Sequence, residues 1–144
     1  MSFNNLDTLY RQVIMDHYKH PKNKGVLEGE AVSVEMNNPT CGDRIMLQLQ
    51  VEDDLVKDVK FDGEGCSISL ASASMMTQAI KGKKLSEALE MSTLFSKMMI
   101  GEEIDVGELD LGDIEALQGV SKFPARIKCA TLAWQAMEKG VQDE

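Results

Sequence analysis

The spacing of apolar residues changes along this chain, and that change constrains the fold more than any other feature. Before residue 21 and after residue 65, apolar residues recur every three or four positions, which predicts amphipathic helices. Between Val32 and Phe61 they alternate with polar residues, which predicts half-buried strands. A helix followed by strands and then by further helices is the element order of an α+β domain.

Three stretches of alternation predict three strands, at 32–36, 45–51 and 55–61. The turn-prone pair Asp53-Asp54 joins the second and third strands as a hairpin. In the third strand, Leu55, Val59 and Phe61 share one parity and therefore one face. The predicted sheet is a three-stranded antiparallel meander.

Helical spacing predicts helices at 6–18, 66–80, 85–99 and 123–141, with a short one near 113–117. The acidic, glycine-containing stretch at about 101–120 is interpreted as a mostly irregular insertion. No domain-scale linker interrupts the chain. We therefore expect one α+β domain over residues 1–144, with the helices packed on one face of the sheet.

Charge and cysteine usage narrow the function. A net charge of −9 disfavours nucleic acid as a partner. The chain starts with MSFNNLDTLY, which does not resemble an export signal, and it has no apolar run of the roughly 20 residues that a membrane span needs. We expect a cytoplasmic protein without a membrane partner, whose three cysteines stay reduced and free for metal or nucleophilic chemistry.

Each cysteine lies at or near the predicted end of a strand or helix, outside the apolar stripes. Gly42 separates Cys41 from Asp43 between the first two strands, so a thiolate and a carboxylate can point into one space. Cys66 lies where a strand becomes a helix, and Cys129 lies in the opening turns of the last helix. Single free cysteines are often buried as small hydrophobes, but three at such positions favour a shared metal site.

The donor set narrows the choice of metal. Three thiolates and one carboxylate suit tetrahedral zinc, and three thiolates equally suit iron or an iron–sulfur cluster. An oxygen ligand among sulfurs exchanges more readily than a fourth thiolate, which favours a site that opens over a closed structural one. Arg126 and Lys128 flank Cys129 and either form a solvated face or act as cations that stabilise nearby thiolates.

Two histidines, His17 and His20, lie at the end of the first predicted helix. Their spacing is compatible with metal binding, yet no cysteine is adjacent in the sequence. Histidine near a helix C-terminus also interacts favourably with the helix dipole. We favour this second interpretation over a role as metal ligands.

Four segments carry a more specific pattern than the cysteine spacing does. They are LYRQVIMDHYKHPKNKG, MNNPTCGDRI, FDGEGCSISLASASMMTQAIKGK and LQGVSKFPARIKCATLAW. Together they resemble the IscU/NifU-like iron–sulfur cluster assembly family, and in particular its SufU branch. The resemblance implies an antiparallel sheet with helices packed on it, and it implies that Cys41, Asp43, Cys66 and Cys129 are the metal ligands.

Two features distinguish the chain from the IscU scaffolds that it resembles. Lys128 stands where those scaffolds have a histidine, and the segment from about Gly101 to Val120 is similar to the insertion typical of the SufU branch. Without that histidine, the resemblance favours zinc-dependent sulfur transfer. It implies a SufS-type pyridoxal-phosphate cysteine desulfurase as the partner, which carries a persulfide whose outer sulfur Cys41 accepts.

In this mechanism one of the four ligands reacts while the other three hold the metal ion. The hypothesis is that docking to the desulfurase releases Cys41 from zinc, while Asp43, Cys66 and Cys129 keep the ion. Arg126 is then a candidate thiolate-stabilising cation. Two alternatives stay open: a scaffold that assembles an iron–sulfur cluster and passes it to the downstream assembly machinery, and a non-catalytic binding module that zinc stabilises.

Overall fold

Helices and strands follow one another in the predicted order in this computed structural model, which describes residues 2–29, 31–38, 42–102 and 112–142. The elements are α1 (Ser2–Lys19), β1 (Val32–Asn38), β2 (Asp43–Glu52), β3 (Leu55–Glu64), α2 (Ser67–Ile80), α3 (Leu85–Met99), the 3₁₀ helix η1 (Gly112–Lys122) and α4 (Pro124–Gln142). The predicted α+β class is confirmed.

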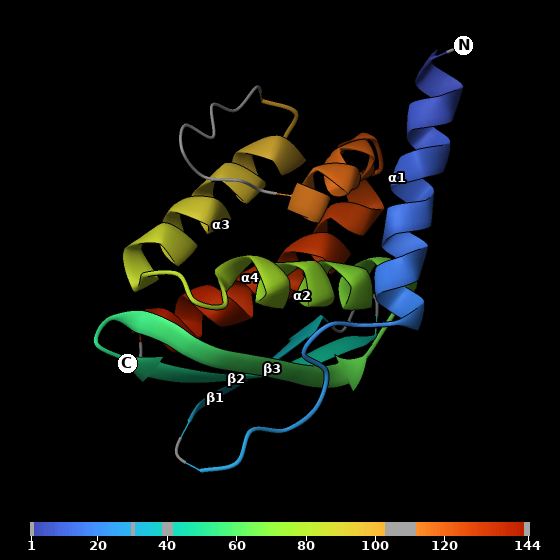
Figure 1. Ribbon diagram of the computed structural model, residues 1–144. Helices are drawn as coiled ribbons and strands as arrows, with labels where there is room; N and C mark the ends of the chain where they lie inside the picture. Colours follow the sequence, from blue (N-terminus) through green and yellow to red (C-terminus); the bar gives the residue numbers. More distant parts are fainter. Residues whose placement is uncertain (1, 30, 39–41, 103–111, 143–144) are drawn as a thin grey trace.

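The sheet has the order β1-β2-β3, and both neighbouring pairs are antiparallel, as predicted. Figure 1 shows the helices as a layer above one face of this sheet. The segment after α1 crosses the other face, where the Leu27 N–H donates a hydrogen bond to Oε1 of Gln48 at 2.8 Å. Among the described residues, no helix is long and apolar enough to cross a membrane.

The hairpin between β2 and β3 explains one error in the predicted faces of the third strand. Asp53 and Asp54 have φ angles of 54° and 61°, the left-handed values of a tight two-residue turn. Beyond the turn, the register shifts between Gln50 and Val51, so that Val51 pairs with Val56. Val56 is consequently buried, and Leu55, which was expected to share a face with Val59 and Phe61, is 39% exposed.

Helix α2 lies at the centre of the helical layer. It contacts α1, α4, η1 and β3, and each residue from Ala71 to Thr77 is buried. Burial extends beyond the apolar residues of this helix: Ile68 and Ala79 are only partly buried, whereas Ser72 and Ser74 are fully buried. A helix with neighbours on several sides buries polar residues as well, and each of them then requires a hydrogen-bond partner.

The remaining helices begin and end close to the predicted positions. Helix α3 ends near Gly101, whose φ of 83° favours glycine. Helix α4 begins at Pro124, where the missing proline N–H costs nothing. The short helix predicted near 113–117 lies within the longer η1, and residues 103–111 of the expected insertion lie outside the described residues.

Candidate metal centre

Asp43 is the first residue of β2, and its side chain is 2% exposed. It pairs with Asn38 at the end of β1, which closes the hairpin between these strands. Gly42 has a φ of 71° and donates its N–H to the Asn38 carbonyl at 2.9 Å. A glycine suits this conformation, because a side chain there would strain the backbone just before the carboxylate.

Cys66 is the N-cap residue of α2 and lies directly beside Asp43. Its backbone N–H donates a hydrogen bond to Oδ1 of Asp43 at 3.1 Å. The Cys66 carbonyl accepts a hydrogen bond from Oγ of Ser69 at 2.9 Å. A Cβ atom on Gly65 would overlap both Oδ1 of Asp43 and Oγ of Ser69, so glycine is required for the carboxylate to approach the start of α2.

Cys129 lies in the second turn of α4 and is fully buried. Although 63 residues separate it from Cys66, the fold brings the starts of β2, α2 and α4 together. A carboxylate oxygen of Asp43 and the Sγ atoms of Cys66 and Cys129 all lie within 4.8 Å of one another. Three of the four predicted ligands therefore converge on one point.

The donor atoms fit a thiolate-bound metal such as zinc. Among the described residues, Oδ2 of Asp43 is buried without a hydrogen-bond partner, a costly state for a carboxylate unless a cation binds it. Sulfur donors favour zinc or iron over calcium or magnesium, which prefer oxygen ligands throughout. Cys41, the fourth predicted ligand, lies outside the described residues and is joined to Asp43 through Gly42 alone.

Comparison with known proteins identifies the family. Residues 9–130 match the model of the NifU-like N terminal domain. The chain belongs to this family. It is 71% identical to the zinc-dependent sulfurtransferase SufU of Bacillus subtilis (strain 168), with 100% of this chain and 97% of the relative covered. It is therefore a SufU-type member of the IscU/NifU-like iron–sulfur cluster assembly proteins, as its motifs predict.

More distant relatives share the fold and the assembly context. The iron–sulfur cluster assembly scaffold protein IscU of Streptococcus pyogenes serotype M1 is 46% identical, with 99% of this chain and 88% of the relative covered. A crystal structure from Fervidobacterium islandicum AW-1, described as an assembly scaffold for the SUF system, has a TM-score of 0.84 at 38% identity. That match covers 90% of this chain and 94% of the other. The predicted arrangement of sheet and helices is thus that of the NifU-like domain.

Two cations lie near the site on the surface of α4. Arg126 is exposed and lies three residues before Cys129, so the two residues lie about one helical turn apart on the same side of α4. Lys128 is exposed and lines a hollow together with Asn37 and Gln135. The stabilising role predicted for Arg126 stays a prediction.

His17 has a structural role that the sequence analysis missed. It is 2% exposed, with Nδ1 at 2.7 Å from Oγ of Ser74 and Nε2 at 2.8 Å from Oδ2 of Asp113. These contacts join α1 to α2 and η1, and they are not part of the group of converging metal donors. A signal was present, because His17 follows Val13 by four positions and so continues the apolar stripe of α1.

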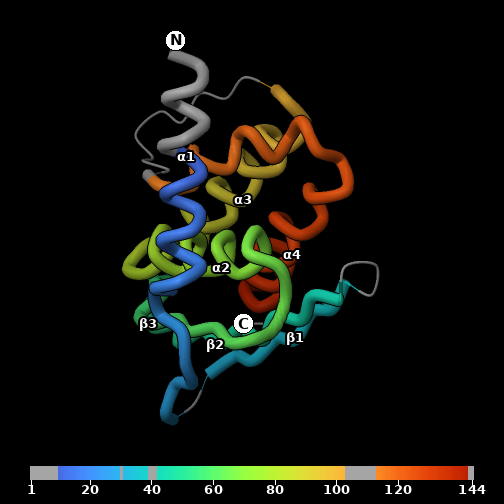
Figure 2. Tube along the Cα trace, turned by 90° about the vertical axis from the view of Figure 1, so that its right-hand side faces the viewer, coloured from blue at the N-terminus to red at the C-terminus, as the bar shows by residue number. Residues whose placement is uncertain are grey.

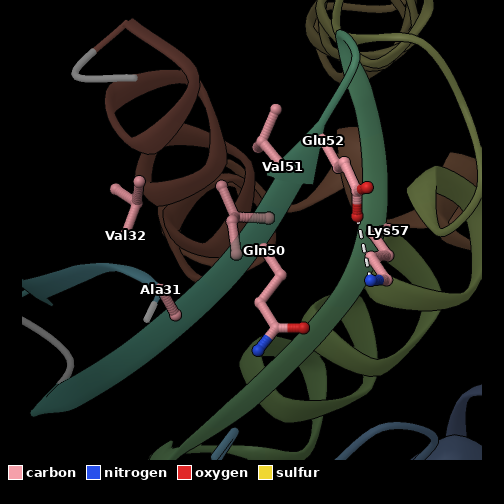
Figure 3. A pocket seen from close by; sticks show the side chains of 7 residues that line it. Ala31, Val32, Gln50, Val51, Glu52 and Lys57 are labelled. Carbon is pink, nitrogen blue, oxygen red and sulfur yellow. Dashed lines mark ion pairs between the residues drawn. The ribbon is translucent and has the colours of Figure 1, made fainter. Parts of the chain in front are cut away.

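A hollow of about 480 Å³ lies at the other end of the sheet, where β2 and β3 meet (Figure 3). Its charged side chains, Glu52 and Lys57, form an exposed ion pair at 2.9 Å. The hydrogen bond and the charge of Lys57 lower the pKa of Glu52. None of the seven lining residues is a cysteine or histidine, so this hollow offers no thiolate or imidazole ligand.

Proposed function

We propose that this chain is a zinc-dependent sulfur acceptor of iron–sulfur cluster assembly, which takes persulfide sulfur from a SufS-type cysteine desulfurase. The observation that carries the proposal is the convergence of Asp43, Cys66 and Cys129, with the unpartnered Oδ2 of Asp43 among them. These residues supply three metal donors. The third cysteine of the chain, Cys41, is then available as the reacting group.

The three converging residues are suited to hold an ion because regular elements fix their positions. Asp43 begins a strand in the middle of the sheet, Cys66 caps a central helix, and Cys129 is buried within α4. Zinc bound by these groups would keep its cysteine ligands as thiolates at neutral pH. Cys41 lies two residues before Asp43 in the sequence, and this short separation supports the proposal that its thiol acts at the same site.

The chemistry proposed for Cys41 requires no external oxidant or reductant. The Cys41 thiolate attacks the outer sulfur of the persulfide on the desulfurase, and a new S–S bond forms. The S–S bond within the donor persulfide breaks, and its inner sulfur leaves as the donor's thiolate. The proton of the outer sulfur stays with it, so Cys41 ends as a persulfide. In this proposal Arg126, which is exposed about one turn from Cys129, attracts the anionic groups involved.

Desulfurase turnover in the presence of cysteine tests the proposal. We expect the wild-type chain to stimulate turnover and Cys41→Ser to leave it at the unstimulated rate, because serine cannot accept the sulfur. Ser92→Ala, a change in a buried serine on α3, is the matched control and should retain full stimulation. Full stimulation by Cys41→Ser would overturn the proposal.

Anaerobic reconstitution with iron and sulfide distinguishes sulfur transfer from a scaffold function. We expect one zinc ion per chain that resists replacement, and no transfer of a cluster to an apo-ferredoxin. A stable and transferable cluster would instead favour the scaffold function. Cysteine alkylation in the complex of this chain with the desulfurase distinguishes these two functions from that of a non-catalytic binding module. A purely structural zinc site would protect all three cysteines from the reagent.

A further inference from the structure

Ser72 joins two of the helices that carry metal donors. It lies in the middle of α2, is fully buried, and donates its hydroxyl proton to the Ala130 carbonyl of α4 at 2.6 Å. The same Oγ accepts a hydrogen bond from Nε1–H of Trp134 at 3.2 Å. One hydroxyl thus bonds to two positions on α4 that lie about one helical turn apart.

The metal donors lie close to these bonds along both helices. Ala130 directly follows Cys129, and Ser72 lies six residues after Cys66, about 9 Å along α2. Figures 1 and 2 both show α2 and α4 side by side above the sheet. Any sliding of one helix along the other would change the separation of the two thiols and would also break the bonds of Ser72.

The bonds of Ser72 add a directional constraint to the apolar packing between α2 and α4. Ser72 lies between Ala71 and Ala73, which are buried and have short side chains. Hydrogen bonds are directional, and a buried hydroxyl that loses its partners lowers stability. The indole of Trp134 is itself held by stacking on Phe95, with ring centroids 4.8 Å apart and planes at 16°.

We propose that Ser72 is a positioning residue for the metal, which keeps Cys66 and Cys129 at the separation that an ion requires through its bonds to Ala130 and Trp134. The inference rests on the proposed metal site and adds a function to a residue that is not itself one of the proposed metal ligands. Trp134 is the sole tryptophan of the chain. Its fluorescence therefore reports on the register that Ser72 sets.

The test compares Ser72→Ala with Ser92→Ala. Both serines are fully buried, and both donate a hydrogen bond to α4, Ser92 to Oε1 of Glu138. Glu138 lies nine residues beyond Cys129, so the bond between Ser92 and Glu138 lies toward the C-terminal end of α4. Both variants remove a hydroxyl group from an equally buried site. Only the bond of Ser72 lies next to a proposed metal ligand, Cys129. Circular dichroism confirms that each variant folds.

Two readouts separate positioning from stability. Zinc affinity, measured against a competing chelator, should fall about tenfold in Ser72→Ala and stay unchanged in Ser92→Ala. Cobalt substituted for zinc should give a visible spectrum with altered thiolate bands in Ser72→Ala alone. Tryptophan emission should respond to zinc in the wild type and in Ser92→Ala, and respond less in Ser72→Ala. Unchanged zinc affinity and an unchanged cobalt spectrum in Ser72→Ala would overturn the inference.

A second variant covers the case in which Ser72→Ala does not fold. Trp134→Phe keeps an aromatic ring beside Phe95 and removes the Nε1–H donor together with part of the indole ring, so we expect a loss of zinc affinity and the same direction of change in the cobalt spectrum. An unaltered spectrum in this variant would also count against the inference. Failure of the wild-type chain to bind zinc would instead contradict the proposed metal site.

Discussion

The backbone N–H of Cys66 donates a hydrogen bond to Oδ1 of Asp43, so one proposed metal donor orients another. Because Oδ1 is engaged in this way, the second carboxylate oxygen, Oδ2, remains for an ion; it has no hydrogen-bond partner among the described residues. The start of α2 and the start of β2 are thereby held in one arrangement. This relationship leads to predictions that differ between the metal-free and the metal-bound protein.

Asp43→Asn should have opposite effects on the two forms. Asparagine can still accept the hydrogen bond from Cys66 but carries no charge, so zinc affinity should fall about 10- to 100-fold. Without metal, the variant should be more stable than the wild type by about 1 kcal/mol, because a buried charge has been removed. Urea unfolding with and without zinc measures both effects.

Glu64→Gln is the matched control for Asp43→Asn. Glu64 is an exposed acid at the end of β3, and its ion pair with Arg44 at 3.3 Å lies on the surface. Its neutralisation should leave zinc affinity unchanged, since exposed pairs contribute little. Equal zinc affinities for Asp43→Asn and the wild type would contradict the role of the Asp43 carboxylate.

Gly65→Ala should weaken metal binding through steric overlap. The added methyl group would meet Oδ1 of Asp43 and Oγ of Ser69, so the carboxylate has to move, at a cost of about 1–3 kcal/mol in stability. Gly119→Ala is the control, because a Cβ atom there meets nothing within 4 Å. Calorimetric titration with zinc should show weaker binding for Gly65→Ala alone. Wild-type affinity in both variants would refute this account of Gly65.

His17→Ala should lower stability without changing zinc affinity. The substitution leaves Ser74 and Asp113 without the partner that joins α1 to α2 and η1, which should cost about 1–3 kcal/mol of unfolding free energy. His20→Ala, at an exposed position, should change it by less than about 0.5 kcal/mol. Urea titration of both variants checks this, and a loss of zinc binding in His17→Ala would show that His17 is a ligand after all.

Removal of zinc should destabilise the chain without unfolding it. The hydrophobic core extends over the sheet and the helices and does not depend on the metal donors. At zinc concentrations about 1,000-fold above Kd, binding adds about 4 kcal/mol, which corresponds to a Tm shift of about 10 °C in a chain of this size. Thermal melts with and without chelator should show this shift with an unchanged circular dichroism spectrum at 25 °C. Complete unfolding on chelation would support a purely structural zinc site.

The sequence predicted most of the fold because hydrophobic spacing directly reflects which side of an element is buried. The prediction was wrong where burial depends on contacts between elements and not on spacing within one element. Leu55 was placed on the wrong face because the register shift near Val51 arises from strand pairing, which a single strand does not encode. Ser72 and Ser74 are buried although apolar spacing does not mark them, because a central helix also buries small polar side chains.

The sequence indicated the residues of the candidate site but not how they meet in space. Glycines and element ends mark Asp43 and Cys66, and the start of the last predicted helix marks Cys129; in the structure their donor atoms lie within 4.8 Å of one another. Their convergence depends on how α4 packs against α2, and sequence spacing does not contain that information. The resemblance to the family supplied the specific set of ligands.

Native mass spectrometry after incubation with a SufS-type desulfurase and cysteine reports bound zinc and acquired sulfur on the same sample. We expect one zinc ion per wild-type chain and one added sulfur atom, which peptide mapping assigns to Cys41. We expect Cys41→Ser to bind zinc through Asp43, Cys66 and Cys129 but to gain no sulfur. Sulfur on Cys66 or Cys129, or undiminished sulfur uptake by Cys41→Ser, would contradict the proposed role of Cys41.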